Sequence, residues 1–133
     1  MTLQLTIITS SEEQTDQLGR QLAPILRAGD LIYLSAPMGS GKTVLVRGLV
    51  RELSGADIDV PSPTFMLVQH YDTQPAVTHA DLYRLEAAEE LLEIGLEEAA
   101  EQRIVIVEWP EKGAGYLSDD ALQIRGEIEG NIR

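Results

Sequence analysis

The segment that most constrains the fold runs from Leu31 to Leu53 and reads "LIYLSAPMGSGKTVLVRGLVREL". Its apolar start, "LIYLSA", is typical of a buried strand, and the glycine-rich stretch after it is followed by Leu45, Leu49 and Leu53 at helical spacing. Strand, loop and helix in this order form the unit that binds phosphate in many α/β proteins. We therefore predict an α/β fold, a single domain of the P-loop NTPase type with a mostly parallel central sheet and flanking helices.

The loop itself carries the chemistry of that prediction. In the pattern G-x-x-x-x-G-K-[ST], backbone N–H groups surround a phosphate, the lysine reaches the outer phosphates and the hydroxyl binds magnesium. The matching residues are Gly39, Ser40, Gly41, Lys42 and Thr43. Ala36 replaces the first glycine, but it ends the strand, and the glycines that approach phosphate are kept. The alternative, a plain glycine turn with an incidental lysine, does not account for the strand and the amphipathic helix on either side.

Two acidic residues are candidates for the same site. Glu108 ends "IVIVE", a β-branched run that predicts a central parallel strand covered on both faces. Ligands gather at the carboxyl edge of such sheets, and magnesium takes oxygen ligands, so we predict that Glu108 helps to hold the metal. Otherwise it is a surface acid at the end of a strand. Alternation in "THADLYRL" places His79, Asp81 and Tyr83 on one face. Asp81 either positions water or magnesium or is solvated or ion-paired, and we expect His79 to pack and hydrogen-bond.

Composition limits the class of protein. With 133 residues, 44% of them hydrophobic, the chain has material for one core, and we expect one domain over residues 1–133. The absence of cysteine, of a long apolar run and of a cleavable leader predicts a cytoplasmic protein that does not enter a membrane. Because 22 acidic residues face 10 basic ones, we expect no direct nucleic-acid binding; the acidity serves either solubility or a basic partner surface.

Patterns elsewhere predict the remaining elements. "LQLTIIT" alternates like a strand, and Ser10 with Glu13 has the spacing of a capping box. The following helix is expected to end near Gly29, with an apolar face that includes Leu18, Leu22, Ile25 and Leu26. The two prolines of "VPSPTF" exclude a regular element there. Two strands separated by a turn, a helical segment divided at Gly95 and a last strand near an edge complete the expectation.

Taken together, "GSGKT", "SPTF", "HADLYRL" and "VEWPE" closely resemble the TsaE family, the ATPase of bacterial threonylcarbamoyladenosine biosynthesis on tRNA. The resemblance implies ATP bound by the loop from Gly39 to Thr43 and by the backbone N–H of Val44. It implies magnesium held by Thr43 and Glu108, with Lys42, Asp81 and Glu108 as catalytic residues. Trp109 and Glu111 would lie close to the nucleotide, and Ser10 would border the adenine.

The same resemblance implies the partners. A protein of this family binds a complex of TsaD and TsaB, and slow ATP hydrolysis resets that complex between rounds of transfer. Thr64 of "SPTF" either senses the outer phosphate or is an ordinary loop residue, and Arg84 is expected in a salt bridge. The chain departs from the family pattern at Ala36, where the first loop glycine is usual, and at Val44, where a second threonine is common.

A phosphate-binding loop also occurs in proteins with other functions. A GTPase is disfavoured because the chain has no N-K-x-D stretch. A small-metabolite kinase needs cationic residues that close over the phosphates, and the eight arginines are scattered. A nucleotide-gated binding module without hydrolysis is the third possibility.

Overall fold

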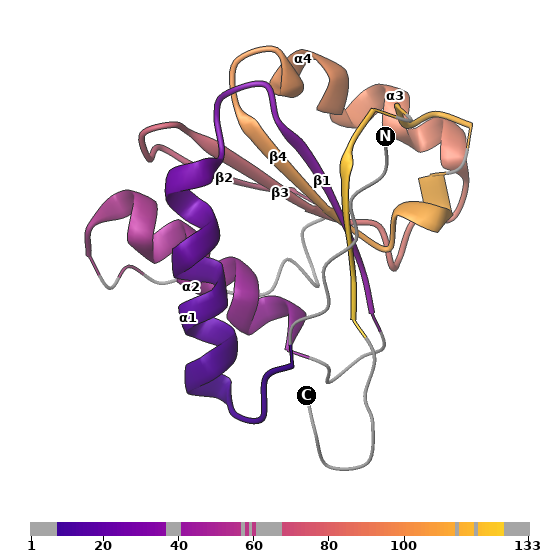
Figure 1. The fold of residues 1–133 in the computed structure, drawn as a ribbon. Coiled ribbons are helices and arrows are strands. Elements are labelled where there is room, and N and C mark those ends of the chain that lie inside the picture. The colour runs from indigo at the N-terminus through magenta and orange to yellow at the C-terminus, as the bar shows by residue number, and fades with distance from the viewer. Residues whose placement is uncertain are drawn as a thin grey trace.

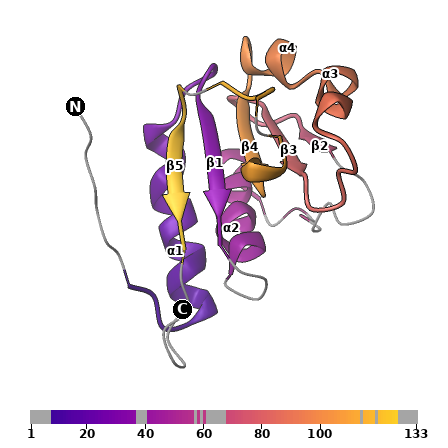
Figure 2. The same cartoon turned by 90° about the vertical axis from the view of Figure 1, so that its right-hand side faces the viewer.

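Five strands form one sheet in the computed structural model, which describes residues 8–36, 41–56, 58, 60, 68–113, 115–118 and 120–126. The strands are β1 (Leu31–Ser35), β2 (Val68–Tyr71), β3 (Val77–Asp81), β4 (Ile104–Glu108) and β5 (Leu122–Arg125). Their order is β2-β3-β4-β1-β5, and every neighbouring pair is parallel except β2 with β3. Figure 2 shows this order across the sheet. The predicted α/β fold with a mostly parallel sheet is confirmed.

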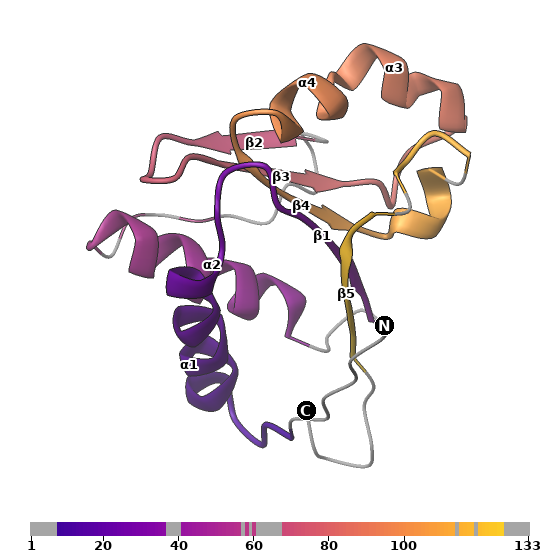
Figure 3. The same ribbon diagram turned by 45° about the horizontal axis from the view of Figure 1, so that its top comes forward.

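Helices cover both faces of the sheet (Figures 1 and 3). The helices are α1 (Glu12–Leu22), α2 (Lys42–Ser54), α3 (Leu91–Ile94) and α4 (Leu96–Ala100), with short 3-10 helices at Ala23–Ile25, Ala88–Glu90 and Pro110–Gly113. One core lies between α1, α2 and the sheet, and includes Val46, Val50 and Ile106. A second core lies under α3 and α4, and includes Leu91 and Val107. None of the helices in the described ranges is long and apolar enough to cross a membrane.

β4 is buried along its whole length because it lies between β3 and β1 and under helices on both faces. This confirms the interpretation of "IVIV" as a central parallel strand. Gly95 divides α3 from α4 with φ of 76°, a conformation that a glycine adopts without strain. β5 is an edge strand, as predicted for the tail. The expected strand "LQLTIIT" falls largely on residues 1–7 and "SPTF" on 62–65, and these positions lie outside the described residues.

The start of α1 corrects one prediction. The N-cap is Ser11, whose hydroxyl accepts a hydrogen bond from the N–H of Gln14 at 3.2 Å. The side chain of Gln14 in turn accepts from the N–H of Ser10 at 2.7 Å. The capping pair is therefore Ser11 with Gln14, one residue later than the predicted Ser10 with Glu13. The two pairs have the same spacing in the sequence, so spacing alone does not distinguish them.

The end of α1 corrects a second prediction. The helix ends at Leu22, not near Gly29, and a 3-10 helix that contains Pro24 follows it. This change of helical geometry turns Ile25 outward, so that 69% of its surface is exposed, whereas Leu26 is buried. Ile25 therefore does not belong to the apolar face on which helical spacing placed it.

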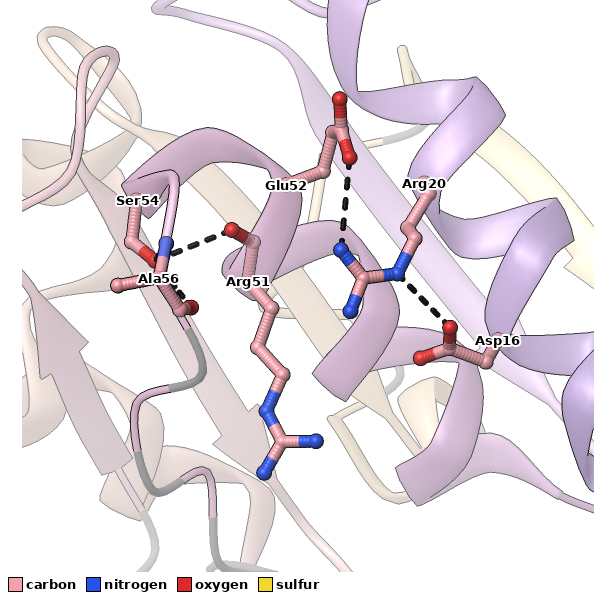
Figure 4. Close-up of polar contacts among 6 residues, drawn as sticks. All are labelled: Asp16, Arg20, Arg51, Glu52, Ser54 and Ala56. Carbon is pink, nitrogen blue, oxygen red and sulfur yellow. Dashed lines mark hydrogen bonds and ion pairs between the residues drawn. The ribbon is translucent and has the colours of Figure 1, made fainter.

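α1 and α2 pack with their backbones in close approach. A Cβ atom on Gly19 would lie 2.2 Å from the carbonyl oxygen of Leu45, and one on Gly48 would lie 2.3 Å from that of Asp16. Arg20 adds ion pairs to Asp16 at 2.8 Å within α1 and to Glu52 at 3.5 Å across to α2 (Figure 4). Each helix thus presents a glycine to the backbone of the other, and the position of α2 on the sheet depends on α1.

Gly19→Ala is expected to destabilise the protein, although alanine is the better helix former by about 1 kcal/mol. The added methyl group has no space beside the Leu45 carbonyl, so the free energy of unfolding should fall by about 1–3 kcal/mol. Urea unfolding measures it. Gln17→Ala, on the exposed side of the same helix, is the control and should change stability by less than about 0.5 kcal/mol. Equal stability of Gly19→Ala and wild type would contradict the close packing.

Candidate functional site

Lys42 is the first residue of α2, and its side chain contacts residues at the carboxyl ends of β1 and β4. Its Nζ donates a hydrogen bond to the carbonyl oxygen of Ala36 at 2.8 Å and lies 3.9 Å from Oε1 of Glu108. It also lies 4.2 Å from the centroid of the Trp109 ring. Gly41, the N-cap of α2, has φ of 99°, which accounts for a glycine at this position. The lysine, the strand-terminal acid and the helix start therefore meet at one point.

Glu108 is a buried carboxylate with 3% of its surface exposed. Its Oε2 lies 2.5 Å from Nε2 of His79, which is 1% exposed. The strand register explains this contact: Asp81 pairs with Glu108 and His79 pairs with Ile106, so the four side chains share one face of the sheet. The predicted hydrogen bonding of His79 is confirmed, and burial excludes the interpretation of Glu108 as a surface acid.

Asp81 lies beside Glu108 at the same edge of the sheet. Burial raises the pKa of Asp81 above its usual range, and the negative charge of Glu108 acts in the same direction. A hydrogen bond from the N–H of Tyr83 at 2.9 Å and the positive charge of Lys42 oppose the rise. Two neighbouring carboxylates that repel each other form a place where a cation is favourable.

The residues present fit a magnesium ion bound together with phosphate. No group of three or more His, Asp or Glu side chains in the described part of the chain is arranged to hold a metal ion. Magnesium does not require one, because it keeps several waters and takes one or two carboxylates together with phosphate oxygens. Glu108, Asp81 and the hydroxyl of Thr43, in the first turn of α2, supply oxygens of that kind.

Trp109 places an aromatic ring next to Lys42. Its φ of 57° is in the left-handed region, unusual for a residue other than glycine. The ring lies 5.1 Å from that of Tyr83, and Nζ of Lys112 is 5.8 Å from the Tyr83 ring. Trp109 thus lies at the predicted site, whereas Glu111 is an exposed residue of the following 3-10 helix.

Thr15 of α1 lies against the start of α2, and Thr9 of the preceding segment hydrogen-bonds to Thr15. A Cβ atom at Gly41 would lie 3.4 Å from the methyl group of Thr15, and the hydroxyl of Thr15 lies 2.9 Å from that of Thr9. Ser10, adjacent in sequence, donates its hydroxyl to Gln14. The predictions omitted Thr9 and Thr15; the hydroxyl-rich string "TSS" includes Thr9, but no sequence signal marks Thr15.

The structure brings together Lys42, Asp81 and Glu108 of the predicted site, with Trp109 beside them. Gly39, Ser40 and Thr64 lie outside the described residues. Val44 and Thr43 are partly buried in the first turn of α2.

A surface hollow of about 260 Å³ lies elsewhere and is not part of this site. It is lined by Arg20, Arg51, Glu52, Gly55 and Ala56. These residues surround the last turn of α2, as Figure 4 shows for four of them, whereas Lys42 is the first residue of that helix. A helix of 13 residues separates the two places by roughly 20 Å.

The fold and the site define an α/β protein with a lysine and a buried carboxylate at the carboxyl edge of a mostly parallel sheet. A family model described as threonylcarbamoyl adenosine biosynthesis protein TsaE matches residues 9–132. The chain belongs to the TsaE family, and its resemblance to that family is confirmed. The role of this family is in the biosynthesis of threonylcarbamoyladenosine on tRNA.

Individual relatives agree with the family. A tRNA threonylcarbamoyladenosine biosynthesis protein TsaE from Rickettsia felis is 34% identical over 123 residues, which cover 92% of this chain and 72% of that protein. One from Streptomyces coelicolor is 39% identical over 113 residues, 82% of this chain and 76% of that protein. The crystal structure of YdiB from Bacillus subtilis superimposes with a TM-score of 0.82 at 28% identity, covering 98% of this chain and 80% of that one.

Asp81→Asn is expected to change how stability depends on pH. Because the pKa of Asp81 is raised on folding, the folded state binds more protons than the unfolded state above about pH 3.8. The contribution of Asp81 to stability is therefore complete below that pH and is lost as the pH rises through the raised pKa. Asparagine keeps the acceptor for the Tyr83 N–H but does not ionise. The variant should gain thermal stability over wild type at pH 7 and lose that gain near pH 3.5, measured by differential scanning calorimetry; a constant difference between the two proteins would contradict the raised pKa.

Proposed function

We propose that this protein binds ATP with magnesium at the carboxyl edge of its sheet and hydrolyses it slowly in support of threonylcarbamoyladenosine formation on tRNA. The observation that carries the proposal is the meeting of Lys42 at the start of α2 with the buried Glu108 at the end of β4. Lysine and carboxylate in these positions are what a phosphate loop and its metal site require.

Lys42 is held where incoming phosphates could take over its contacts. In the structure its ammonium group is satisfied by the Ala36 carbonyl, by Glu108 and by the Trp109 ring. The outer phosphates of ATP would offer stronger, charge-assisted hydrogen bonds than the carbonyl does. The N–H groups of Gly41, Lys42, Thr43 and Val44 belong to the N-terminal end of α2, which favours an anion.

Glu108 and Thr43 are the proposed metal ligands, and Asp81 is the proposed group that positions the attacking water. Bound magnesium would neutralise the charge that develops on the phosphates during transfer. Asp81 and Glu108 are neighbours on adjacent strands, so one carboxylate can face the metal while the other faces the water. Ser10, Gly39, Ser40, Trp109 and Glu111 complete the proposed nucleotide contacts.

TsaD and TsaB type proteins are the proposed partners, and tRNA is not expected to bind directly. The net charge of −12 disfavours contact with a phosphate backbone and suits a protein surface that carries basic residues. A cytoplasmic location agrees with this assignment.

Lys42→Ala should abolish ATP binding at concentrations that saturate the wild type, because the phosphate-binding loop contains no other lysine. Lys112→Ala removes the chain's only other lysine and is the matched control. Isothermal titration calorimetry with ATP and magnesium measures both. Binding of ATP by Lys42→Ala as tight as by Lys112→Ala would refute the proposed phosphate contact.

Hydrolysis should be slow in the isolated protein, should change when TsaD and TsaB are added, and should be absent in Glu108→Ala. ATP turnover measured with and without both partners, beside a pull-down, separates three functions. An ATP turnover rate that the partners do not change, together with no association in the pull-down, would rule out the proposed role. Turnover only with an added metabolite would favour the kinase, and partner binding without wild-type turnover would favour the binding module.

A further inference from the structure

The two carboxylate oxygens of Glu108 have different neighbours. Oε2 lies 2.5 Å from Nε2 of His79, and Oε1 lies 3.9 Å from Nζ of Lys42. The first contact is buried within the sheet, and the second is directed toward the start of α2. One oxygen is thus fixed to the neighbouring strand, while the other faces the proposed phosphate and metal site.

The direction of the hydrogen bond follows from the other nitrogen of the imidazole ring. Nδ1 of His79 is buried and has no hydrogen-bond partner among the residues described. A buried N–H without an acceptor costs about 1–3 kcal/mol, so the proton is better placed on Nε2 than on Nδ1. His79 therefore donates from Nε2 to the carboxylate of Glu108.

The position of His79 in the sheet makes this contact rigid. β3 lies between β2 and β4, and the neighbours of His79 in the chain, Thr78 and Ala80, have no exposed surface. His79 pairs with Ile106 and reaches diagonally to Glu108, two residues further along β4. Close packing leaves the imidazole little freedom to follow a moving carboxylate.

We propose that His79 is a positioning residue that anchors Oε2 of Glu108 and so presents Oε1 as a single-oxygen ligand to the divalent cation that accompanies the nucleotide. This inference rests on the proposed function and adds to it a residue that touches neither nucleotide nor metal. Without the anchor, the carboxylate is free to rotate toward Lys42 and pair with it, which withdraws it from the cation. Outer-shell partners of this kind are worth about ten- to a hundred-fold in metal affinity.

Two variants of His79 separate the hydrogen bond from the volume of the side chain. His79→Gln keeps an N–H donor at about the place of Nε2, whereas His79→Met has similar length and no donor. ATP affinity is measured by calorimetry with saturating magnesium and again with EDTA. The factor by which magnesium tightens ATP binding is the readout, and it does not depend on turnover. Urea unfolding of each variant reports the stability separately.

The expected result is a magnesium factor reduced about ten- to a hundred-fold in His79→Met and close to wild type in His79→Gln, with ATP affinity in EDTA similar in all three proteins. An unchanged factor in folded His79→Met, or an equal loss in His79→Gln, would overturn the proposal. If His79→Met does not fold, His79→Asn, too short to reach Glu108, takes its place in the same comparison. If the wild type itself shows no magnesium-dependent ATP binding, the proposed function fails, which is distinct from failure of the role of His79.

Discussion

The site depends on one buried carboxylate that is held from two sides. Glu108 lies at the end of the most deeply buried strand, and taking its charge out of water is costly unless hydrogen bonds and opposite charge compensate. His79 supplies the hydrogen bond from β3 and Lys42 supplies the charge from α2. The strands and the helix must therefore be placed correctly before the carboxylate can be accommodated at all.

The placement of α2 in turn depends on α1. Gly19 and Gly48 allow the two backbones to approach closely, and the methyl group of Thr15 lies against Gly41 at the helix start. A displacement of α1 would therefore move Lys42 relative to Glu108. The two helices cover one face of the sheet, whereas α3 and α4 pack on the other. The geometry of the site thus depends on the packing of α1 against α2.

Much of the fold could be predicted because its signals are local. The run "IVIV", the helical spacing of Leu45 and Leu49, and Gly95 as a helix divider each identify an element without reference to the rest of the chain. The errors lie at element ends, where local signals compete. Ser10 and Ser11 are equally good caps by composition, and only the observed backbone and the reach of Gln14 select Ser11. Ile25 fits a helical stripe until the change to a 3-10 helix turns it outward.

The sequence by itself determined the chemistry of the site: a glycine-rich loop with Lys42 and Thr43, an acid at the end of a central strand, and a second acid in "HADLYRL". Residue type and spacing are sufficient for this because each of these signals lies within a short, continuous stretch of the sequence. Only the tertiary structure decided which groups touch Glu108. His79 is 29 residues away from it in the chain, and their contact follows from the register between β3 and β4, which no local pattern records. The same register placed Asp81 beside Glu108, and long-range packing of α1 on α2 placed Thr15 against Gly41.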